Sequence, residues 1–416
     1  MRFTRRELLC GAAAFPLLAA KKPVTRPGVV LIVVEDVGAW MLGAYGNKEI
    51  LTPNLDLLAK TGARFSNSYS GSGAAAQGRA ALLTGQSARR LGFTAEASLP
   101  ASLDTRPMLS DVLSGAGYTC GYSGASDLTP AKAQHGFKVA NTSDDFADVT
   151  AKAVEFLDAQ KPGAPFFLLV HYKFPSEVPA KYAAKYATTS FDTIGWDRPA
   201  SNAAANKDAL GNIVESIRKA AAGMSALDDQ VRALVAKLDE RGLRDSTLTV
   251  FTGSNGALLG RHGLWGDARA SEPPNLYEEV VLVPLIWQWS QKIPPEAIRP
   301  EFVSAFDFVP TLCELTGAAA PADLQQTGRS YLPAVVNTPF PKKQPWRSRL
   351  CGEFGDMVML RDKRYKMVLR AGGKGVNDFF DEIGDPRERV NQYENPRFIT
   401  IRNELAGQIA AWTKTS

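Results

Sequence analysis

The chain has 416 residues, of which 45% are hydrophobic and 22% are charged, so it can bury a large core and is not expected to be disordered. Its net charge of +5 includes no clustered run of lysine and arginine, which argues against a nucleic-acid partner. With three histidines and no CxxC pair, the composition also disfavours a zinc centre.

The N-terminus is typical of an export signal. Arg5 and Arg6 precede an apolar run over residues 8–20, which ends in small residues. Paired arginines before such a run indicate a twin-arginine signal peptide, and the run is too short to cross a bilayer. We therefore expect residues 1–20 to be cleaved. The mature protein is expected to be periplasmic or extracellular, without an integral membrane span.

The predicted elements alternate between strands and helices. Residues 28–38, GVVLIVVEDVG, read as a buried parallel strand that ends in two carboxylates. A helix is predicted after Pro53, a second within RAALLTG, a helix–turn–strand unit over residues 109–124, and another buried strand over residues 164–175. A long helix over residues 208–241 precedes strands at residues 246–256 and 281–289. Residues 358–370 form a predicted hairpin, and an amphipathic helix is predicted after Pro396.

This alternation predicts an α/β fold with a doubly wound, mostly parallel sheet flanked by helices over residues 27–335. A small C-terminal α+β subdomain is expected over residues 345–416. The alanine-rich stretch 182–208 is predicted to be a mobile insertion. Because sites in such sheets lie at the carboxyl ends of the strands, the turns at Glu35 and Asp36 and at Ser254 and Asn255 form the candidate site.

Several motifs in order along the chain resemble those of the sulfatases, which belong to the alkaline-phosphatase-like superfamily. They are VVLIVVEDVGAWMLGAYG, GRAALLTGQ, LYEEVVLVPLIW, VSAFDFVPTLCELTG and DFFDEIGDPRERVNQ. The resemblance spans about residues 27–405. It implies the sulfatase fold, a formylglycine nucleophile made from cysteine or serine, one hard divalent cation, usually calcium, and sulfate ester substrates.

The nucleophile that this resemblance implies is missing. Where the family has the motif C/S-x-P-S-R, residues 75–79 read AAQGR, so that Ala75 holds the nucleophile position and Arg79 is retained. Alanine has no heteroatom and can neither be oxidised to an aldehyde nor attack sulfur. The alternative nucleophiles are Ser70 and Ser72, which lie upstream in a glycine-rich loop where serine is also ordinary turn chemistry.

The implied metal ligands are also depleted. The family uses three aspartates and an asparagine or another polar oxygen, and the corresponding positions are Glu35, Asp36, Ser254 and Asn255. Two carboxylates remain instead of three, and calcium affinity depends on the charge and rigidity of the ligand set. Two interpretations stay open: a weak calcium site, or a polar strand end that is solvated by water.

The groups that the resemblance assigns to sulfate binding follow the same trend. Its lysine and histidine segment corresponds to GASDLT, which leaves Ala125 and Asp127, and its PHxP histidine falls near Ser176. An acid at that position would repel an anion. The lysine expected before LYEE is absent. His262 is either a remaining ligand contact or a loop histidine bonded to the backbone.

We therefore predict an exported sulfatase-family protein without sulfuric ester hydrolase activity. It would bind a glycan or anionic ligand in the old cleft, or a partner protein. The alternative is a hydrolase that activates water on a metal held by Glu35, Asp36 and Asn255, with Arg79 or His262 facing a sulfate or phosphate ester.

Tryptophans supply a further hypothesis. Trp40 follows the first turn of the candidate site and Trp265 lies near the third histidine, so both are candidates for stacking on sugar rings, with core packing as the alternative. Exposed apolar side chains around Trp196 and Trp346 would instead indicate an interaction subunit.

Overall fold

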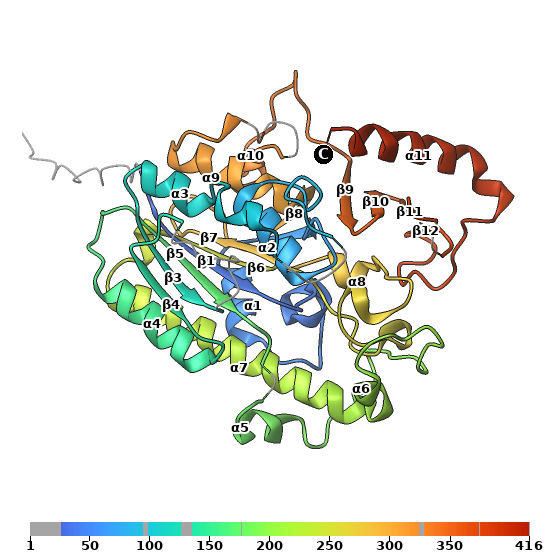
Figure 1. Ribbon diagram of the computed structural model, residues 1–416. Helices are drawn as coiled ribbons and strands as arrows, with labels where there is room; N and C mark the ends of the chain where they lie inside the picture. Colours follow the sequence, from blue (N-terminus) through green and yellow to red (C-terminus); the bar gives the residue numbers. More distant parts are fainter. Residues whose placement is uncertain are drawn as a thin grey trace, which may run out of the picture.

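The computed structural model describes residues 26–94, 99–125, 135–175, 177–322, 324, 328–373 and 375–415. An eight-stranded sheet with the strand order β4-β3-β5-β1-β6-β7-β2-β8 runs through the main body (Figure 1). All neighbouring strands are parallel except β7, which is antiparallel to both β6 and β2. The strands are β1 (Gly28–Val34), β2 (Ala63–Tyr69), β3 (Thr119–Gly124), β4 (Val139–Thr142), β5 (Phe166–Tyr172), β6 (Thr247–Gly253), β7 (Leu285–Gln288) and β8 (Ala297–Ser304).

Strand β1 is buried along its whole length because helices cover both faces of the sheet. Side chains alternate along a strand, so Val29, Leu31 and Val33 pack on one face, with α2, α3, α9 and α10. The intervening residues pack on the other face, with α1, α4 and α7. These helices are α1 (Pro53–Lys60), α2 (Ala75–Thr84), α3 (Leu109–Gly115), α4 (Phe146–Asp158), α7 (Ile213–Glu240), α9 (Phe308–Thr316) and α10 (Leu332–Val335). The layered sheet confirms the predicted fold class.

The stretch predicted as an insertion carries short helices beside α7. They are α5 (Ala180–Ala183), η4 (Ala184–Tyr186) and α6 (Lys207–Gly211) (Figure 1). Helix α7 also fixes the start of α1, because the carboxylate of Asp228 accepts hydrogen bonds from the backbone N–H groups of Asn54 and Leu55 at 3.1 and 2.8 Å. These contacts satisfy amides that no helical carbonyl can reach.

The C-terminal segment forms a second, antiparallel sheet with the order β12-β11-β10-β9. Its strands are β9 (Arg349–Phe354), β10 (Met357–Asp362), β11 (Tyr365–Arg370) and β12 (Asp378–Asp381), and β10 and β11 form the predicted hairpin. Helix α11 (Ile399–Thr413) lies on this sheet (Figure 1), where Leu405 and Ile409 pack against Val358, Leu360 and Met367.

Buried charges join this second sheet to the main body. Lys366 on β11 is fully buried, and its Nζ lies 2.8 Å from Glu388 and 3.2 Å from Glu278 at the start of α8 (Glu278–Val281). A second link runs through Glu353 on β9, whose backbone N–H donates to Gly71 at 3.0 Å. Within the described part of the chain, the search for a helix with the length and hydropathy of a membrane span found none.

Candidate functional site

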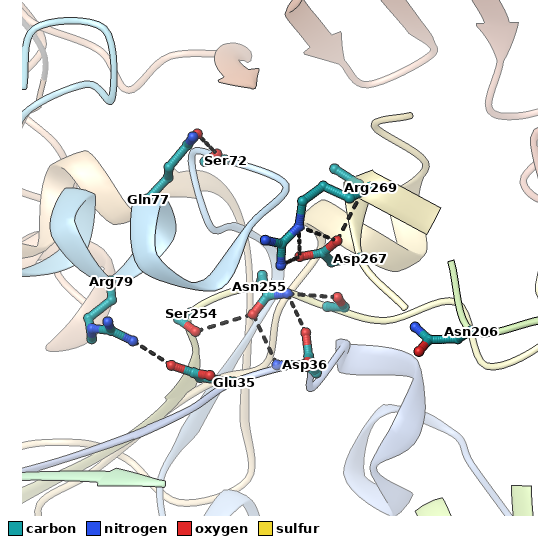
Figure 2. A network of polar contacts seen from close by, with 12 residues as sticks. Glu35, Asp36, Ser72, Gln77, Arg79, Asn206, Ser254, Asn255, Asp267 and Arg269 are labelled. Atoms are coloured by element: carbon teal, nitrogen blue, oxygen red, sulfur yellow. Dashed lines mark hydrogen bonds and ion pairs between the residues drawn. The ribbon is translucent and has the colours of Figure 1, made fainter. Parts of the chain in front are cut away.

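The candidate site lies where two adjacent strands end. Glu35 and Asp36 follow β1 directly, and Ser254 and Asn255 follow β6, which pairs with β1 in parallel register. The backbone N–H of Ser254 continues this pairing by donating to the carbonyl of Val34 at 2.8 Å. The structure therefore brings together the four residues considered as metal ligands, at the carboxyl edge of the sheet (Figure 2).

Glu35 points away from the other three side chains and toward α2. It continues the face of Val33, which α2 covers, and its carboxylate forms an ion pair with Arg79 (Figure 2). His171, near the end of β5, places Nε2 3.0 Å from the same carboxylate oxygen, Oε1, and 3.1 Å from Nη1 of Arg79. Burial alone would raise the pKa of Glu35, but the hydrogen bond and charge of His171 and the charge of Arg79 lower it to about 2.

Asp36 and Asn255 satisfy each other. The backbone of Asp36 has a left-handed φ of 56°, and its N–H donates to Oδ1 of Asn255 at 2.9 Å. In return, Nδ2 of Asn255 donates to the Asp36 carboxylate at 2.7 Å (Figure 2). The Ser254 hydroxyl lies 3.2 Å from Oδ1 of Asn255 and 3.4 Å from the carbonyl of Val34. Oxygen ligands of calcium must converge on one centre. The side chains of Asp36, Ser254 and Asn255 meet, but Glu35 turns to Arg79, so the four together do not fit a divalent cation.

A second carboxylate lies near Asp36. Burial and, next, the charge of Asp267 raise the pKa of Asp36 to about 7. Asp267 is buried and accepts charge-assisted hydrogen bonds from Nε and Nη2 of Arg269, the shortest at 2.6 Å (Figure 2). Asp267 lies in the segment before LYEE, within which the sulfatase resemblance implies a lysine, and this segment instead brings a carboxylate close to Asp36.

Helix α2 presses directly on the turn after β6. A Cβ built at Gly78 would lie 1.8 Å from the carbonyl oxygen of Ser254, so no side chain can be accommodated there without moving the helix. Ala75 is the first residue of α2 and is half-buried, and the preceding Ala74 provides no side-chain cap. The helix start thus offers neither a heteroatom nor room beside the strand ends.

The upstream serines are held by hydrogen bonds. The buried Ser70 hydroxyl donates to the carbonyl of Ser72, and the Ser72 hydroxyl donates to Gln77 at 2.7 Å (Figure 2). Gln77 in turn donates to the carbonyl of Thr94 at 2.8 Å. These bonds tie the loop to α2 and leave neither hydroxyl positioned as a nucleophile.

The remaining predicted residues do not assemble around an anion. Ala125 is fully buried, and its carbonyl accepts a hydrogen bond from Tyr122; Asp127 and Ser176 lie outside the described residues. His262 stacks on Tyr277, with ring centroids 3.7 Å apart and an interplanar angle of 10°.

The other contacts of His262 are with the acidic side chains of Glu279 and Asp197. Its Nε2 lies 3.4 Å from Oε2 of the buried Glu279, and its backbone N–H donates to Asp197 at 2.8 Å. The guanidinium of Arg261 covers Trp40, 3.9 Å from the ring centroid. Trp40 itself donates to the carbonyl of Ala257 at 3.1 Å.

A cleft of about 1000 Å³ opens beside this site. Asp36 lines this cleft, together with the half-buried aromatic rings of Phe174 and Trp265. Charged side chains of its lining also include those of Glu177, Glu215, Arg218 and Lys219. Of the two tryptophans considered as cleft residues, Trp265 lines the cleft and also packs against the core, whereas Trp40 packs against the core and lies under the guanidinium of Arg261.

Among the described residues, the carboxylates near enough to share a metal ion are Glu278, Glu382 and Glu388. Lys366 forms ion pairs with Glu278 and Glu388, and Arg361 lies 3.4 Å from Glu278 and 3.5 Å from Glu382. These two cations offset two of the three carboxylates, and the cluster links the two sheets.

A mostly parallel sheet with acidic and amide side chains at the carboxyl ends of adjacent strands is the arrangement in which open α/β folds place their ligand sites. The chain belongs to the sulfatase family: residues 27–318 match the family model Sulfatase. Residues 260–415 also match the model described as N-sulphoglucosamine sulphohydrolase, C-terminal.

Individual relatives agree with this assignment. An ulvan-active sulfatase of Formosa agariphila is 27% identical over 468 residues, covering 93% of this chain and 74% of the relative. Arylsulfatase A of Homo sapiens is 28% identical over 381 residues, covering 80% and 71%. A solved structure of a protein in complex with its substrate D-glucosamine-2-N,6-O-disulfate has a TM-score of 0.79 at 21% identity, covering 94% of this chain and 98% of that one.

Two residues of the site escaped the sequence analysis. His171 lies in the apolar strand segment FFLLVHY, and a polar residue so near the carboxyl end of a predicted central strand is the signal that could have found it. Asp267 lies in the segment before LYEE, where the resemblance implies a lysine, so the sequence analysis did not consider an acidic side chain there.

Proposed function

We propose that this chain is an exported sulfatase-family protein that has lost sulfuric ester hydrolysis and binds a glycan in the cleft beside the former centre. The observation that carries the proposal is Ala75 at the first position of α2, where the family resemblance places the nucleophile. A side chain without a heteroatom can form no covalent sulfate intermediate. The fixed hydrogen bonds of Ser70 and Ser72 argue against a substitute nucleophile.

The charges at the centre also oppose sulfate binding. Arg79 is retained, but its guanidinium neutralises Glu35. Asp36 lines the cleft, and the adjacent Asp267 adds a second carboxylate. Hydrolysis of a sulfate ester needs positive groups where negative charge develops, and removing one such group typically costs about 100- to 1000-fold in rate. An acidic group near the centre should lower the rate of hydrolysis further.

The cleft itself favours a carbohydrate ligand. Trp265 and Phe174 offer half-exposed aromatic faces, and Glu215, Arg218 and Asp36 supply hydrogen-bonding groups around them. Aromatic faces bordered by a few polar groups suit the apolar face and the hydroxyls of a sugar ring. Relatives support this class of ligand, since one acts on ulvan and another was solved with a disulfated glucosamine.

The alternative, a hydrolase that activates water on a metal, requires Glu35, Asp36 and Asn255 to share one cation. Glu35 instead pairs with Arg79, and Asp36 and Asn255 bond to each other. The donor set therefore supports the binding function over the hydrolytic one. Cleavage of residues 1–20, the domain division at residues 27–335 and 345–416, and a partner protein remain parts of the proposal.

The test combines turnover with glycan binding on the mature chain, residues 21–416. We expect no hydrolysis of 4-nitrophenyl sulfate or 4-nitrophenyl phosphate above a protein-free blank, with or without added calcium. Calorimetric titration with sulfated and desulfated ulvan and heparin oligosaccharides should detect binding. Trp265→Ala should weaken it by about fivefold, because a lost aromatic contact costs about 1 kcal/mol.

Trp412→Ala is the matched control, because Trp412 lies on α11 in the C-terminal segment. It should leave the affinity for the oligosaccharide unchanged. Turnover that disappears in Asp36→Ala would overturn the loss of activity. Equal weakening by both tryptophan variants would overturn the assignment of the cleft.

A further inference from the structure

His171 is not among the residues that the sulfatase resemblance implies, and it completes a buried group with Glu35 and Arg79. We propose that the guanidinium of Arg79, with His171 as a second partner of Glu35, takes the place of the divalent cation, so that this sulfatase-family member assembles its strand ends without calcium. The inference concerns the folded state alone and does not depend on which ligand the cleft binds.

The first step is the burial of the carboxylate. Glu35 is 7% exposed, and an ionised carboxylate is retained in such surroundings only when it is paired and hydrogen-bonded. Arg79, which is 2% exposed, forms an ion pair with its Oε1, and His171, which is fully buried, places Nε2 3.0 Å from the same atom. Both partners of Oε1 are therefore cationic or proton-donating groups of the chain.

The second step is the set of contacts around His171. The Tyr122 hydroxyl donates to the carbonyl of Ala125, and its oxygen lies 3.3 Å from Nδ1 of His171. On the other side of the ring, Nε2 lies 3.0 Å from the Glu35 carboxylate and 3.1 Å from Nη1 of Arg79. Both ring nitrogens are therefore engaged by buried groups of the chain, which holds the ring beside Glu35.

The third step explains how these groups reach one point. Glutamate is one methylene longer than the aspartate implied by the family, which carries the carboxylate past the strand end to α2. The absence of a side chain at Gly78 lets α2 approach the Ser254 carbonyl closely, and Arg79 is the next residue. Strand β5 is the parallel neighbour of β1, with His171 in register with Val33.

The fourth step is what a cation would meet. A divalent ion bound to the carboxylate of Glu35 would lie close to the guanidinium of Arg79 and be repelled by it. Ser254 offers only a neutral hydroxyl, and Asn255 is engaged with Asp36. The residues at positions 35 and 254 thus remove both the need for a cation and the ligands that would hold it.

Thermal unfolding of the mature chain tests this proposal. We expect the Tm in 5 mM EDTA and in 5 mM CaCl2 to agree within about 1 °C. A cation at one hundred times its Kd would raise the Tm of a chain this long by about 3 °C. Calcium titration calorimetry and terbium luminescence should detect no binding.

Variants test the buried group of Glu35, Arg79 and His171 itself. Glu35→Gln should lower the Tm by about 4 °C, because it leaves Arg79 and His171 buried without their carboxylate. The matched control is Glu155→Gln, which removes an exposed ion pair with Lys152 at 2.9 Å and should change the Tm by less than about 1 °C.

A calcium-dependent Tm in the wild-type chain, lost in Asp36→Ala, would overturn the proposal. An unchanged Tm in Glu35→Gln would overturn it as well, since the buried ion pair would then contribute nothing to the stability of the fold. Failure of the binding proposal shows instead as ester turnover or as missing glycan affinity, with the calcium response unaltered. The two outcomes are therefore separable.

Discussion

Replacing Gly78 by alanine is expected to destabilise the protein, although alanine is the better helix former. Gly78 lies inside α2, and a Cβ there would come within 1.8 Å of the Ser254 carbonyl oxygen and 2.9 Å of its carbonyl carbon. An ordinary contact is at least 3.4 Å, so α2 must retreat by about 1.5 Å. The obstacle is backbone and cannot swing aside.

The size of the effect follows from two opposing contributions. Overpacking costs about 1–3 kcal/mol, with the upper end appropriate between two pieces of backbone. Alanine gains about 1 kcal/mol over glycine in a helix interior. The expected net loss is about 2 kcal/mol of the free energy of unfolding, which lowers the Tm of a chain this long by about 2 °C.

The matched control is Gly407→Ala in α11, where the same Cβ would meet nothing within 4 Å. There the propensity gain acts alone, so the free energy of unfolding should rise by about 0.5–1 kcal/mol. Urea unfolding followed by tryptophan fluorescence measures both variants. The reasoning is refuted if Gly78→Ala matches or exceeds the wild-type stability, because α2 would then not touch the turn after β6.

Two further predictions concern buried charges. Burial raises the pKa of Glu279, but its hydrogen bond to His262 and the charge of that ring lower it more, to about 2. The stabilisation by Glu279 is therefore complete above about pH 5 and is lost as the pH falls toward 2, so the penalty of Glu279→Gln in urea unfolding should shrink by more than half between about pH 7 and pH 3. A penalty independent of pH would contradict this assignment. Lys366→Met should cost about 3–5 kcal/mol, because Glu278 and Glu388 lose their shared buried cation, and a loss below about 1 kcal/mol in the same assay would show that the pair is not buried in solution.

The parts of the fold that could be predicted are those written locally in the sequence. The apolar segment of β1 and the hairpin of β10 and β11 follow from residue patterns a few positions long, and so does the location of the site at the strand ends. The antiparallel strand β7 within a mostly parallel sheet could not be inferred, since its segment has the same apolar pattern as its parallel neighbours.

The partners within the site could not be predicted for a related reason. Glu35 and His171 are separated by 136 positions, and no local pattern relates them. In the sequence, His171 stands in an apolar strand and Glu35 looks like a metal ligand beside Asp36. Only the packing of β5 against β1, and of α2 over both, shows that Glu35 turns toward a histidine and an arginine.

The position of β1 in the sheet has a consequence for biosynthesis. This strand leaves the ribosome first, yet the residues paired with Val30 are Leu168 on β5 and Thr249 on β6, which are made much later. At about 5–20 residues per second, the later of these partners follows after roughly 10–40 s. Until β5 and then β6 have been made, this apolar segment lacks one or both of the strands that flank it in the sheet. Assembly of the central strands is thus necessarily late in translation, which suits a secretion route that accepts finished proteins, as the paired arginines predict.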